Sequence, residues 1–426
     1  MWLGDTLRSA PAAPSPAKRI RCGFVTTPPG AKDRLLTLPF VLAATVALLQ
    51  GMAFFLFVHF PRFLTSLGAD EVMVGLVVSA AAVASIAVRP RVGITTDRRG
   101  RRPLILAGGA LHVLVLPLYL TVGALGAWVI TVRLLHGIAS ALVFTALFTY
   151  GADHVPETRR TEGLALFGAA TMIPMAAGGW VGDAVLAAAG FDALFLVALG
   201  FAAAGFTLSL GLPEPKRSPV PPGRSPARFR ETLTQRDLMP LWFLSFAFAL
   251  VLTGYFTFMR TFVDQTGVGS VGSFFAAYAI ASLAVRAFAG WLPERIGRRR
   301  VLYPSLGAVA AAFVLLAEAR TAPPVIVAGV LCGIGAGYAF PIVYAMVVER
   351  ADVAARGAAV ALFTALFDAG TLAGSPTLGW VIVRFGYSRM FFTAAALMVL
   401  ATAVYAVWDG DLPRRRAAAQ PGTHRV

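Results

Sequence analysis

The sequence predicts an all-α membrane protein with twelve transmembrane helices in two pseudo-symmetric six-helix bundles. Three observations support this fold class: the overall hydrophobicity, the number and length of the apolar segments, and an internal repeat. Hydrophobic residues make up 58% of the 426 residues and charged residues only 14%, and the mean hydropathy is +0.73. A water-soluble domain needs a far more polar surface than this composition supplies. The chain is therefore predicted to be an integral membrane protein.

Twelve apolar segments are long enough to cross a hydrocarbon core about 30 Å thick, which takes about 20 helical residues. The first six are expected at residues 37–60, 72–92, 103–123, 127–150, 163–187 and 191–211. The second six are expected at residues 238–262, 271–293, 301–319, 323–347, 357–383 and 388–408. Each segment is predicted to form one membrane-spanning helix.

The remaining segments are polar and are expected to lie outside the membrane. Residues 1–36 are predicted to be a disordered cytoplasmic N-terminal tail, and residues 411–426 a cytoplasmic C-terminal tail. Residues 213–237 are rich in Pro and basic residues, a composition typical of flexible linkers. This cytoplasmic linker is predicted to join an N-terminal bundle at 37–212 to a C-terminal bundle at 238–410.

The distribution of positive charge predicts the orientation. Of the 37 Lys and Arg residues, 31 fall on the side of the tails and the linker, Arg133 falls inside a span, and five fall on the opposite side. These five are Arg62, Arg260, Arg320, Arg384 and Arg389. Because Lys and Arg accumulate in cytoplasmic loops, both termini are predicted to be cytoplasmic. Arg outnumbers Lys by 34 to 3, as in GC-rich bacterial genomes, so the expected location is the bacterial inner (plasma) membrane.

The sequence also argues against other classes of protein. The net charge of +16 does not indicate nucleic-acid binding, because the basic residues lie in short segments between apolar runs. Cys22 lies in the tail and Cys332 in a span, so neither a disulfide nor a metal site is expected. The sequence shows no nucleophile with a base and no nucleotide-binding Gly-rich loop. Enzyme activity, a cofactor and direct use of ATP are therefore not expected.

The two halves of the chain repeat each other. Residues 84–102 align without a gap on residues 281–299, so that Arg89 matches Arg286. Further matches at this or nearly this offset are Gly93 with Gly290, Asp97 with Glu294, Arg101 with Arg298, Gly137 with Gly333, Asp153 with Glu349 and Gly190 with Gly386. Parallel six-helix repeats joined by a long linker are typical of secondary transporters, in which one half rocks against the other.

The repeated segment resembles a family signature. In both copies a Gly is followed by three residues, an acid, Arg, one residue, Gly and two arginines, as GITTDRRGRR from Gly93 and GWLPERIGRR from Gly290. These residues, between the second and third and the eighth and ninth of twelve spans, are similar to the signature loop of the major facilitator superfamily (MFS). The resemblance covers nearly the whole chain apart from the tails and implies the MFS fold. Within the family, the chain looks most similar to arabinose-type and drug efflux permeases.

Each copy of the signature is expected to form a cluster of charges. Gly93 and Gly290 would let a neighbouring helix approach closely, and the acid would accept hydrogen bonds from a helix N-terminus. The expected clusters are Asp97 with Arg98, Arg101 and Asp153, and Glu294 with Arg295, Arg298 and Glu349. The resemblance implies that they latch the cytoplasmic side, and exposed ion pairs worth about 0–1 kcal/mol suit a latch that opens in every cycle. The alternative is that the arginines serve only the membrane topology.

Three ionisable residues within the predicted spans are candidates for proton or substrate coupling. Arg133 in the fourth span cannot lose its proton and needs an anion or water, and the resemblance associates this position with coupling. His136 lies three residues further on, on nearly the same helix face. Asp368 in the eleventh span is a candidate proton carrier. The alternatives are snorkelling for Arg133, a satisfied interior histidine for His136 and a structural role for Asp368.

Aromatic residues are expected to line a central cavity, which the resemblance places between the first, fourth, seventh and tenth helices. The candidates are Phe55, Phe144, Phe148, Tyr255, Phe258, Tyr338, Phe340 and Tyr344. Such a lining suits an apolar or amphipathic solute, although aromatic residues in membrane helices also pack without binding a ligand.

The sequence thus favours a monomeric secondary transporter that works by alternating access in a lipid bilayer and binds a small-molecule substrate. The first interpretation is export of small organic molecules in exchange for protons, with the proton gradient as the energy source. The alternatives are a proton symporter or uniporter that imports sugars or carboxylates, and a sensor or scaffold that moves no substrate. The fifth span departs from the Gly-Pro motif of proton-driven drug antiporters, since Ile173 precedes Pro174.

Overall fold

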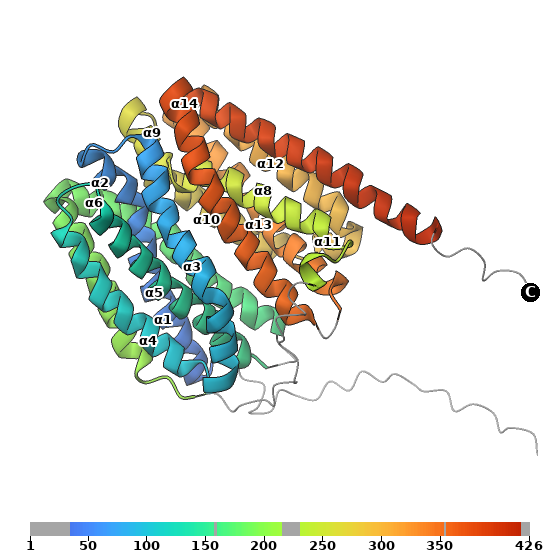
Figure 1. The fold of residues 1–426 in the computed structure, drawn as a ribbon, viewed down its shortest axis with the longest axis horizontal. Helices are drawn as coiled ribbons and strands as arrows, with labels where there is room; N and C mark the ends of the chain where they lie inside the picture. Colours follow the sequence, from blue (N-terminus) through green and yellow to red (C-terminus); the bar gives the residue numbers. More distant parts are fainter. Residues whose placement is uncertain (1–34, 157–159, 215–230, 353–354, 419–426) are drawn as a thin grey trace, which may run out of the picture.

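The computed structural model describes residues 35–156, 160–214, 231–352 and 355–418, and in this part of the chain all regular secondary structure is helical (Figure 1). Almost all of the predicted tail 1–36, most of the predicted linker 213–237 and the end of the predicted tail 411–426 lie outside the described residues.

The described helices of the first half of the chain follow one another closely. They are α1 (Leu38–Phe55), the 3-10 turn η2 (Leu56–His59), α2 (Phe60–Ser66), α3 (Glu71–Arg99), α4 (Arg102–Val115), the 3-10 turn η3 (Leu116–Thr121), α5 (Ala127–Asp153) and α6 (Arg160–Ser209). Local sequence explains several helix starts: the Asp70 carboxylate accepts a hydrogen bond from the Met73 backbone N–H at 2.8 Å, and α1 and α4 have Pro in the first turn.

The second half also consists of helices. They are α8 (Met239–Phe256), α9 (Met259–Thr266), α10 (Val271–Ala289), α11 (Leu292–Ile296), α12 (Arg298–Glu318), α13 (Ala322–Arg350) and α14 (Arg356–Ala418). The last helix continues past residue 408, where the sequence analysis placed the end of the twelfth span.

Two of the helices each contain two spans. Ten helical segments of the described chain are long and apolar enough to cross a membrane, and α6 and α14 are the ones with a break inside. The breaks lie at Gly190, with φ 76° and ψ −166°, and at Gly386, with φ 82° and ψ 172°. This backbone region is adopted almost exclusively by glycine. Counting both parts of each helix gives twelve spans, which confirms the predicted fold class.

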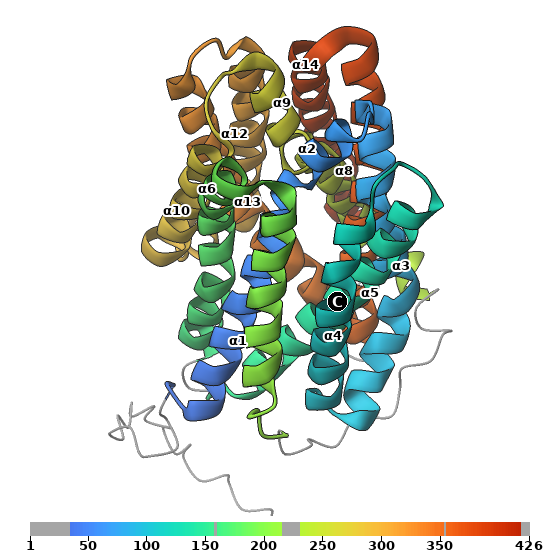
Figure 2. The same cartoon turned by 90° about the vertical axis from the view of Figure 1, so that its left-hand side faces the viewer.

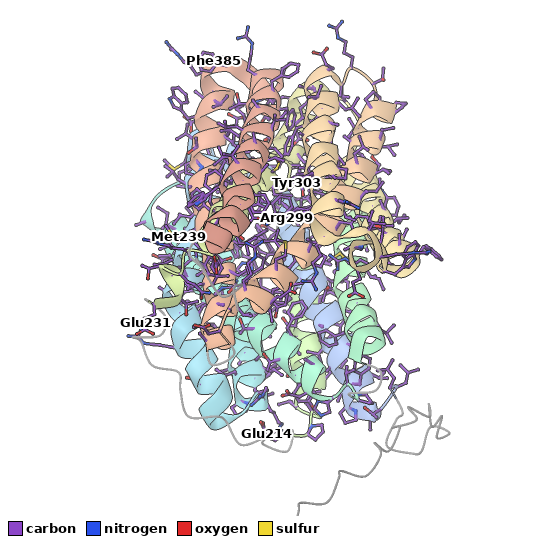
Figure 3. The ribbon with its side chains drawn as sticks, turned by 90° about the vertical axis from the view of Figure 1, so that its right-hand side faces the viewer. Glu214, Glu231, Met239, Arg299, Tyr303 and Phe385 are labelled. Atoms are coloured by element: carbon purple, nitrogen blue, oxygen red, sulfur yellow. The ribbon has the colours of Figure 1, made fainter. Side chains whose placement is uncertain are left out.

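The two halves meet along two pairs of helices. In the contacts between halves, α3 packs against α14 and α6 packs against α10, while the short α2 and α9 also touch. Figures 1 and 2 show α2 and α9 together at one end of the molecule. We call this the α2–α9 end, and the end that carries the Gly93 and Gly290 segments the signature end. Figure 3 shows Glu214 and Phe385 at opposite ends of the molecule.

Small residues allow the halves to approach closely near the α2–α9 end. A Cβ atom added to Gly179 of α6 would lie 2.8 Å from the Cα of Gly272 in α10. A Cβ atom added to Gly75 of α3 would likewise collide with the backbone of Ser375 in α14. Backbones this close leave no room for larger side chains, so this end of the interface is tightly packed.

Candidate functional site

Asp368 on α14 is paired with Arg89 on α3, across the two halves. The Arg89 Nε atom lies 2.6 Å from Asp368 Oδ2, and Arg89 Nη2 donates to Asp368 Oδ1 at 3.3 Å. Ser85, one helical turn before Arg89, donates its hydroxyl to Asp368 Oδ2 at 3.1 Å. The sequence analysis singled out Asp368 but missed its partner, because a partner 279 residues away in the chain depends on which helices of the two halves meet.

The first signature segment brings Arg101 to Asp153. The Arg101 Nε atom lies 2.8 Å from Asp153 Oδ2, so the ion pair connects the start of α4 with the end of α5. Gly93, Asp97 and Arg98 lie on the last part of α3, but their side chains lie outside the described part of the structure.

Glu214 is a further member of this group that the sequence analysis missed. Its carboxylate accepts hydrogen bonds from the backbone N–H groups of Arg101, at 2.9 Å, and Arg102, at 3.2 Å. A carboxylate is favourable at a helix N-terminus because the first N–H groups lack partners within the helix. The sequence analysis assigned this role to Asp97. The sequence did contain one indication of this role, because Glu214 is an acidic residue directly after the predicted sixth span.

The second signature segment differs from the first. Arg298 forms an ion pair with Glu349, but in the described structure Glu294 and Arg295 do not join that pair. Glu294 is exposed, and the Arg295 guanidinium lies 5.4 Å from the centre of the Trp291 ring. The expected four-residue cluster is therefore not formed here. The reason is that α10 ends at Ala289 and Glu294 lies on the separate short helix α11, whereas α3 continues unbroken to Arg99.

Gly290 also departs from its expected role. A Cβ atom added there would lie 2.6 Å from the Arg286 carbonyl oxygen of the preceding turn, and not against another helix. The close approach expected for this glycine is instead made by Gly333 of α13, whose added Cβ would collide with the Tyr278 carbonyl oxygen on α10.

Arg133 and His136 lie in a buried polar group inside the first half. Arg133 is only 8% exposed, so it does not snorkel to the surface, and its guanidinium carbon lies 5.0 Å from the centre of the Phe60 ring. Among the described residues Arg133 forms no ion pair. Its guanidinium lies over the rings of Phe57 and Phe60 and interacts with the Tyr119 hydroxyl. His136 Nδ1 lies 3.0 Å from the Tyr119 hydroxyl, and its ring centre lies 5.1 Å from that of His112.

The eight aromatic candidates for the cavity lie in different environments. Phe148, Phe340 and Tyr344 are exposed, and Phe55 and Phe144 are half-buried. Tyr338 is buried and donates its hydroxyl to the Ala289 carbonyl oxygen at 2.9 Å. Tyr255 and Phe258 are fully buried, so in this conformation they do not line an open cavity.

The burial of Tyr255 has a clear cause. Its ring lies 5.4 Å from that of Phe274 on α10 and 5.8 Å from that of Phe313 on α12, measured between ring centres. This face of α8 therefore packs inside the second half.

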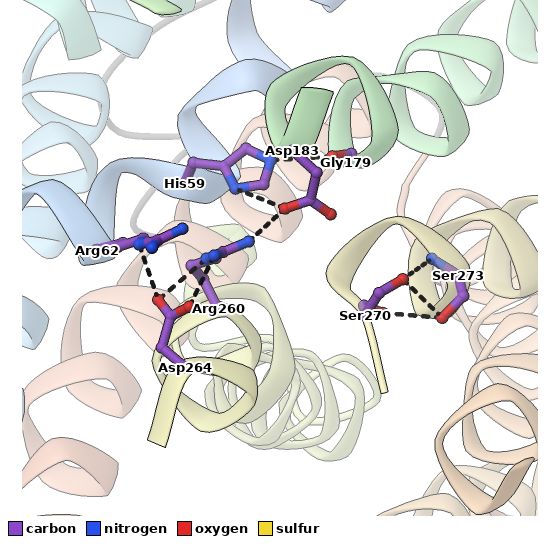
Figure 4. Close-up of polar contacts among 8 residues, drawn as sticks. All are labelled: His59, Arg62, Gly179, Asp183, Arg260, Asp264, Ser270 and Ser273. Carbon is purple, nitrogen blue, oxygen red and sulfur yellow. Dashed lines mark hydrogen bonds and ion pairs between the residues drawn. The ribbon is translucent and has the colours of Figure 1, made fainter. Parts of the chain in front are cut away.

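At the α2–α9 end, charged residues of both halves form a network that the sequence analysis did not predict (Figure 4). Arg260 on α9 pairs with Asp183 on α6 across the halves. Arg260 also binds Asp264 on its own helix, with Nη2 2.7 Å from Oδ1 and Nε 3.1 Å from Oδ2. Arg62 Nε on α2 lies 3.5 Å from Asp264 Oδ2, which makes a second ion pair between the halves. His59 lies beside Asp183 in the same network.

A second polar contact between the halves lies at the same end. Glu71, at the start of α3, accepts hydrogen bonds from Gln265 Nε2 at 2.9 Å and from the Tyr387 hydroxyl at 3.0 Å. The sequence analysis used Arg62 and Arg260 only as topology signals. The spacing of four residues between Arg260 and Asp264 was a visible sign of pairing, but nothing in the sequence pointed to Asp183.

The comparisons with known proteins agree with this architecture. The sequence matches the model of the Major Facilitator Superfamily over residues 40–317 and 265–425. It is 25% identical over 347 residues to an uncharacterised MFS-type transporter of Salmonella typhimurium, over 79% of this chain and 87% of that protein. It is 28% identical over 166 residues to the multidrug resistance protein MdtH of Aeromonas hydrophila, over 38% of this chain and 42% of that protein.

Solved structures show the same fold. A crystal structure of a mutant of the nucleoside transporter NupG has a TM-score of 0.74 and 14% sequence identity, over 87% of this chain and 99% of that chain. At this identity the likeness concerns the fold alone.

Proposed function

The chain belongs to the Major Facilitator Superfamily and is a multi-pass membrane transporter, and from this premise we propose that it exports small organic molecules in exchange for protons. The resemblance drawn from the two signature segments is thereby confirmed. The proposal itself concerns the direction of transport, the coupling to protons and the apolar or amphipathic character of the solute. In this proposal the chain works by alternating access in a bacterial inner membrane, with both termini in the cytoplasm.

The ion pair between Arg89 and Asp368 is the observation that carries the proposal. It joins α3 of the first half to α14 of the second, and the Asp368 side chain is only 18% exposed. A proton on Asp368 would remove its negative charge and with it the Coulombic attraction to Arg89. Proton binding would therefore weaken the contact between the halves, and such a difference in interaction between two states is what coupling between a proton and a conformational change requires. One proton moving through 100 mV would supply about 2.3 kcal/mol for uphill export.

The signature segments are proposed to act as latches within each half. Arg101 with Asp153 and Arg298 with Glu349 each join two helices of the same half. Glu349 is exposed, and an ion pair at the surface is worth about 0–1 kcal/mol, so the second pair can form and break in each cycle. Arg101 and Asp153 are half-buried, so the first pair is the better shielded of the two.

Two observations support this proposal, the first for the apolar or amphipathic character of the solute and the second also for export. Phe148, Phe340 and Tyr344 offer exposed aromatic surface on helices of both halves. The local similarity to a protein named for multidrug resistance points in the same direction. A second candidate, import of a carboxylate solute, is favoured by Arg133, which is buried and has no acidic partner among the described residues.

The test is proton flux in liposomes that contain the purified full-length protein. A panel of lipophilic cations, sugars and carboxylates is added, and internal pH is followed for the wild type, Asp368→Asn and the control Asp192→Asn, which changes an exposed aspartate. We expect lipophilic cations to drive proton movement in the wild type and the control, and Asp368→Asn to lose it while still binding the solute.

Three results would contradict parts of the proposal. If solute equilibrates without proton movement in the wild type, the protein is a uniporter. If Asp368→Asn keeps the full flux, the proton is carried elsewhere. If only carboxylates drive flux, the second candidate replaces the first.

A further inference from the structure

His59 is a fully buried histidine at the α2–α9 end, and its two ring nitrogens have different surroundings. Nε2 lies 3.1 Å from the carbonyl oxygen of Gly179. A carbonyl oxygen only accepts hydrogen bonds, so Nε2 carries the hydrogen and Nδ1 has a free electron pair when the ring is neutral. Nδ1 lies 3.9 Å from Asp183 Oδ1 and has no hydrogen-bond partner among the described residues. The unprotonated nitrogen therefore faces a carboxylate.

In this conformation Asp183 is paired with an arginine of the second half. Arg260 of the second half donates to the same oxygen, Asp183 Oδ1, that His59 Nδ1 faces (Figure 4). Arg260 is also held by both oxygens of Asp264. If the halves separate at this end, Arg260 therefore keeps an anion on its own helix, whereas Asp183 loses the guanidinium that contacts it.

We propose that His59 and Asp183 form a proton-binding site in which a proton competes with Arg260 for the Asp183 carboxylate. This inference rests on the proposed proton coupling and adds the site through which protons act at the α2–α9 end. A proton from water binds His59 Nδ1 when the halves separate, and the resulting N–H donates to Asp183 Oδ1. Nε2–H remains on the Gly179 carbonyl, and no other bond changes. Loss of that proton lets Arg260 return to Asp183.

The charges around His59 explain why the two arrangements exclude each other. The groups that face it are Asp183 from α6, Arg260 and Asp264 from α9, and Arg62 from the adjoining α2 joins the same network. With His59 neutral, two carboxylates balance two guanidinium groups. A proton on His59 adds a positive charge beside Arg260, and like charges this close repel each other. Separation of the halves relieves the repulsion, because protonated His59 stays with Asp183 while Arg260 stays with Asp264.

Burial controls when the proton can exchange. His59 has no exposed surface in the closed arrangement, and the close backbone contact of Gly179 with Gly272 lies next to it. Water reaches Nδ1 only when the halves move apart at this end. The site therefore exchanges its proton with the α2–α9 side alone, so it makes the opening of this end depend on the pH of that side. Release of a transported proton on the other side needs a different group, for which Asp368 is the proposed carrier.

The test measures the separation of the halves directly. Spin labels are attached to the full-length protein at two exposed positions of the α2–α9 end, through Ser66→Cys on α2 and Glu318→Cys on α12, in a Cys22→Ser, Cys332→Ser background. Label distances are recorded in detergent micelles between about pH 5 and pH 8, the interval in which a histidine changes charge. We expect the population with the wide distance to grow as the pH falls.

Three variants separate the proposed site from other sources of pH dependence. His59→Gln keeps an amide donor for the Gly179 carbonyl but cannot take up a proton, so its distance distribution should not change with pH. Arg260→Gln removes the competitor, so the wide population should be enlarged at every pH. Arg384→Gln, which changes an exposed arginine of the same end, should keep the wild-type response.

If the distances in His59→Gln change with pH as they do in the wild type, the inference is overturned. If His59→Gln elutes as an aggregate, Asp183→Asn is measured in its place: a wide population that no longer depends on pH supports the site, and a wild-type response refutes it. This result is independent of the proton-flux assay. A wild type without solute-driven proton flux contradicts the proposed function, whereas a pH response that survives in His59→Gln contradicts the site alone.

Discussion

Asp409 is a fully buried carboxylate that connects three helices of the second half. Arg350 Nη1 of α13 lies 2.5 Å from its Oδ1, and Arg299 Nη2 of α12 lies 2.6 Å from its Oδ2. Tyr405, one turn earlier on α14, donates its hydroxyl to Oδ2 at 3.0 Å. A buried charge is tolerated only when partners of this kind surround it, so each partner depends on Asp409.

Asp409→Asn is expected to destabilise the protein strongly. The substitution leaves Arg350, whose side chain is 17% exposed, without its anion, whereas Arg299 is 40% exposed and keeps contact with water. Breaking a buried ion pair costs about 3–5 kcal/mol, and the exposure of Arg299 places the expected loss near the lower limit. Thermal unfolding in detergent micelles measures the loss. The control Asp352→Asn changes an exposed aspartate and should shift stability by less than about 0.5 kcal/mol. Equal unfolding temperatures for the two variants would contradict the structural role of Asp409.

At the scale of the elements, the breaks in α6 and α14 determine how the last two spans of each half lie. Gly190 and Gly386 have matching positions in the internal repeat and nearly the same backbone angles. Each glycine turns the chain back between two spans without a loop. A side chain at such an angle is strained even where space is available, because the conflict is with its own backbone.

A comparison of two glycines in α6 tests this directly. Neither Gly190 nor Gly200 has another heavy atom within 4 Å of an added Cβ, so alanine changes only the backbone preference at both positions. Gly190→Ala should lose about 1–3 kcal/mol, because its angles are nearly exclusive to glycine. Gly200→Ala should gain about 0.5–1 kcal/mol, because alanine favours a helix. Unfolding in detergent micelles should therefore show shifts of opposite sign, and shifts of the same sign would contradict the argument.

At the scale of the whole molecule, ion pairs join the two halves at two positions along the length of the helices. The network of Arg260 with Asp183 closes the α2–α9 end, and Arg89 with Asp368 joins α3 to α14 further toward the signature end. If one half rocks against the other, the first network must break whenever the α2–α9 end opens. Charged contacts suit this task better than a continuous apolar interface, because water and protons can replace them.

The orientation of the molecule in the membrane is a prediction at this scale. The excess of Lys and Arg on the side of the termini places the signature end in the cytoplasm. In a Cys22→Ser, Cys332→Ser background, a membrane-impermeant maleimide should label Ser66→Cys at the α2–α9 end in intact cells. Asp352→Cys, an exposed position just after the end of α13, should be labelled only after the cells are permeabilised. The reverse pattern would show that the termini lie outside.

The fold class and the number of spans followed from the sequence alone. A span is recognised by its length and hydropathy, which are properties of one continuous segment. The repeat added further information, because it identified Asp153 and Glu349 as equivalent acids, and both lie beside the expected arginines. Each of these two ion pairs joins residues of the same six-helix half.

The contacts between the halves were decided by the tertiary structure. Arg89 and Asp368 are 279 residues apart, and Arg260 and Asp183 are 77 residues apart on helices of different halves. Which residues form such pairs depends on how each helix is rotated and on where the two halves touch. Neither property can be derived from the hydropathy of a span. For the same reason the sequence could not show that Tyr255 is buried or that Glu294 lies on a separate helix. The sequence alone thus determined the architecture, and the three-dimensional packing of the halves decided which charges meet.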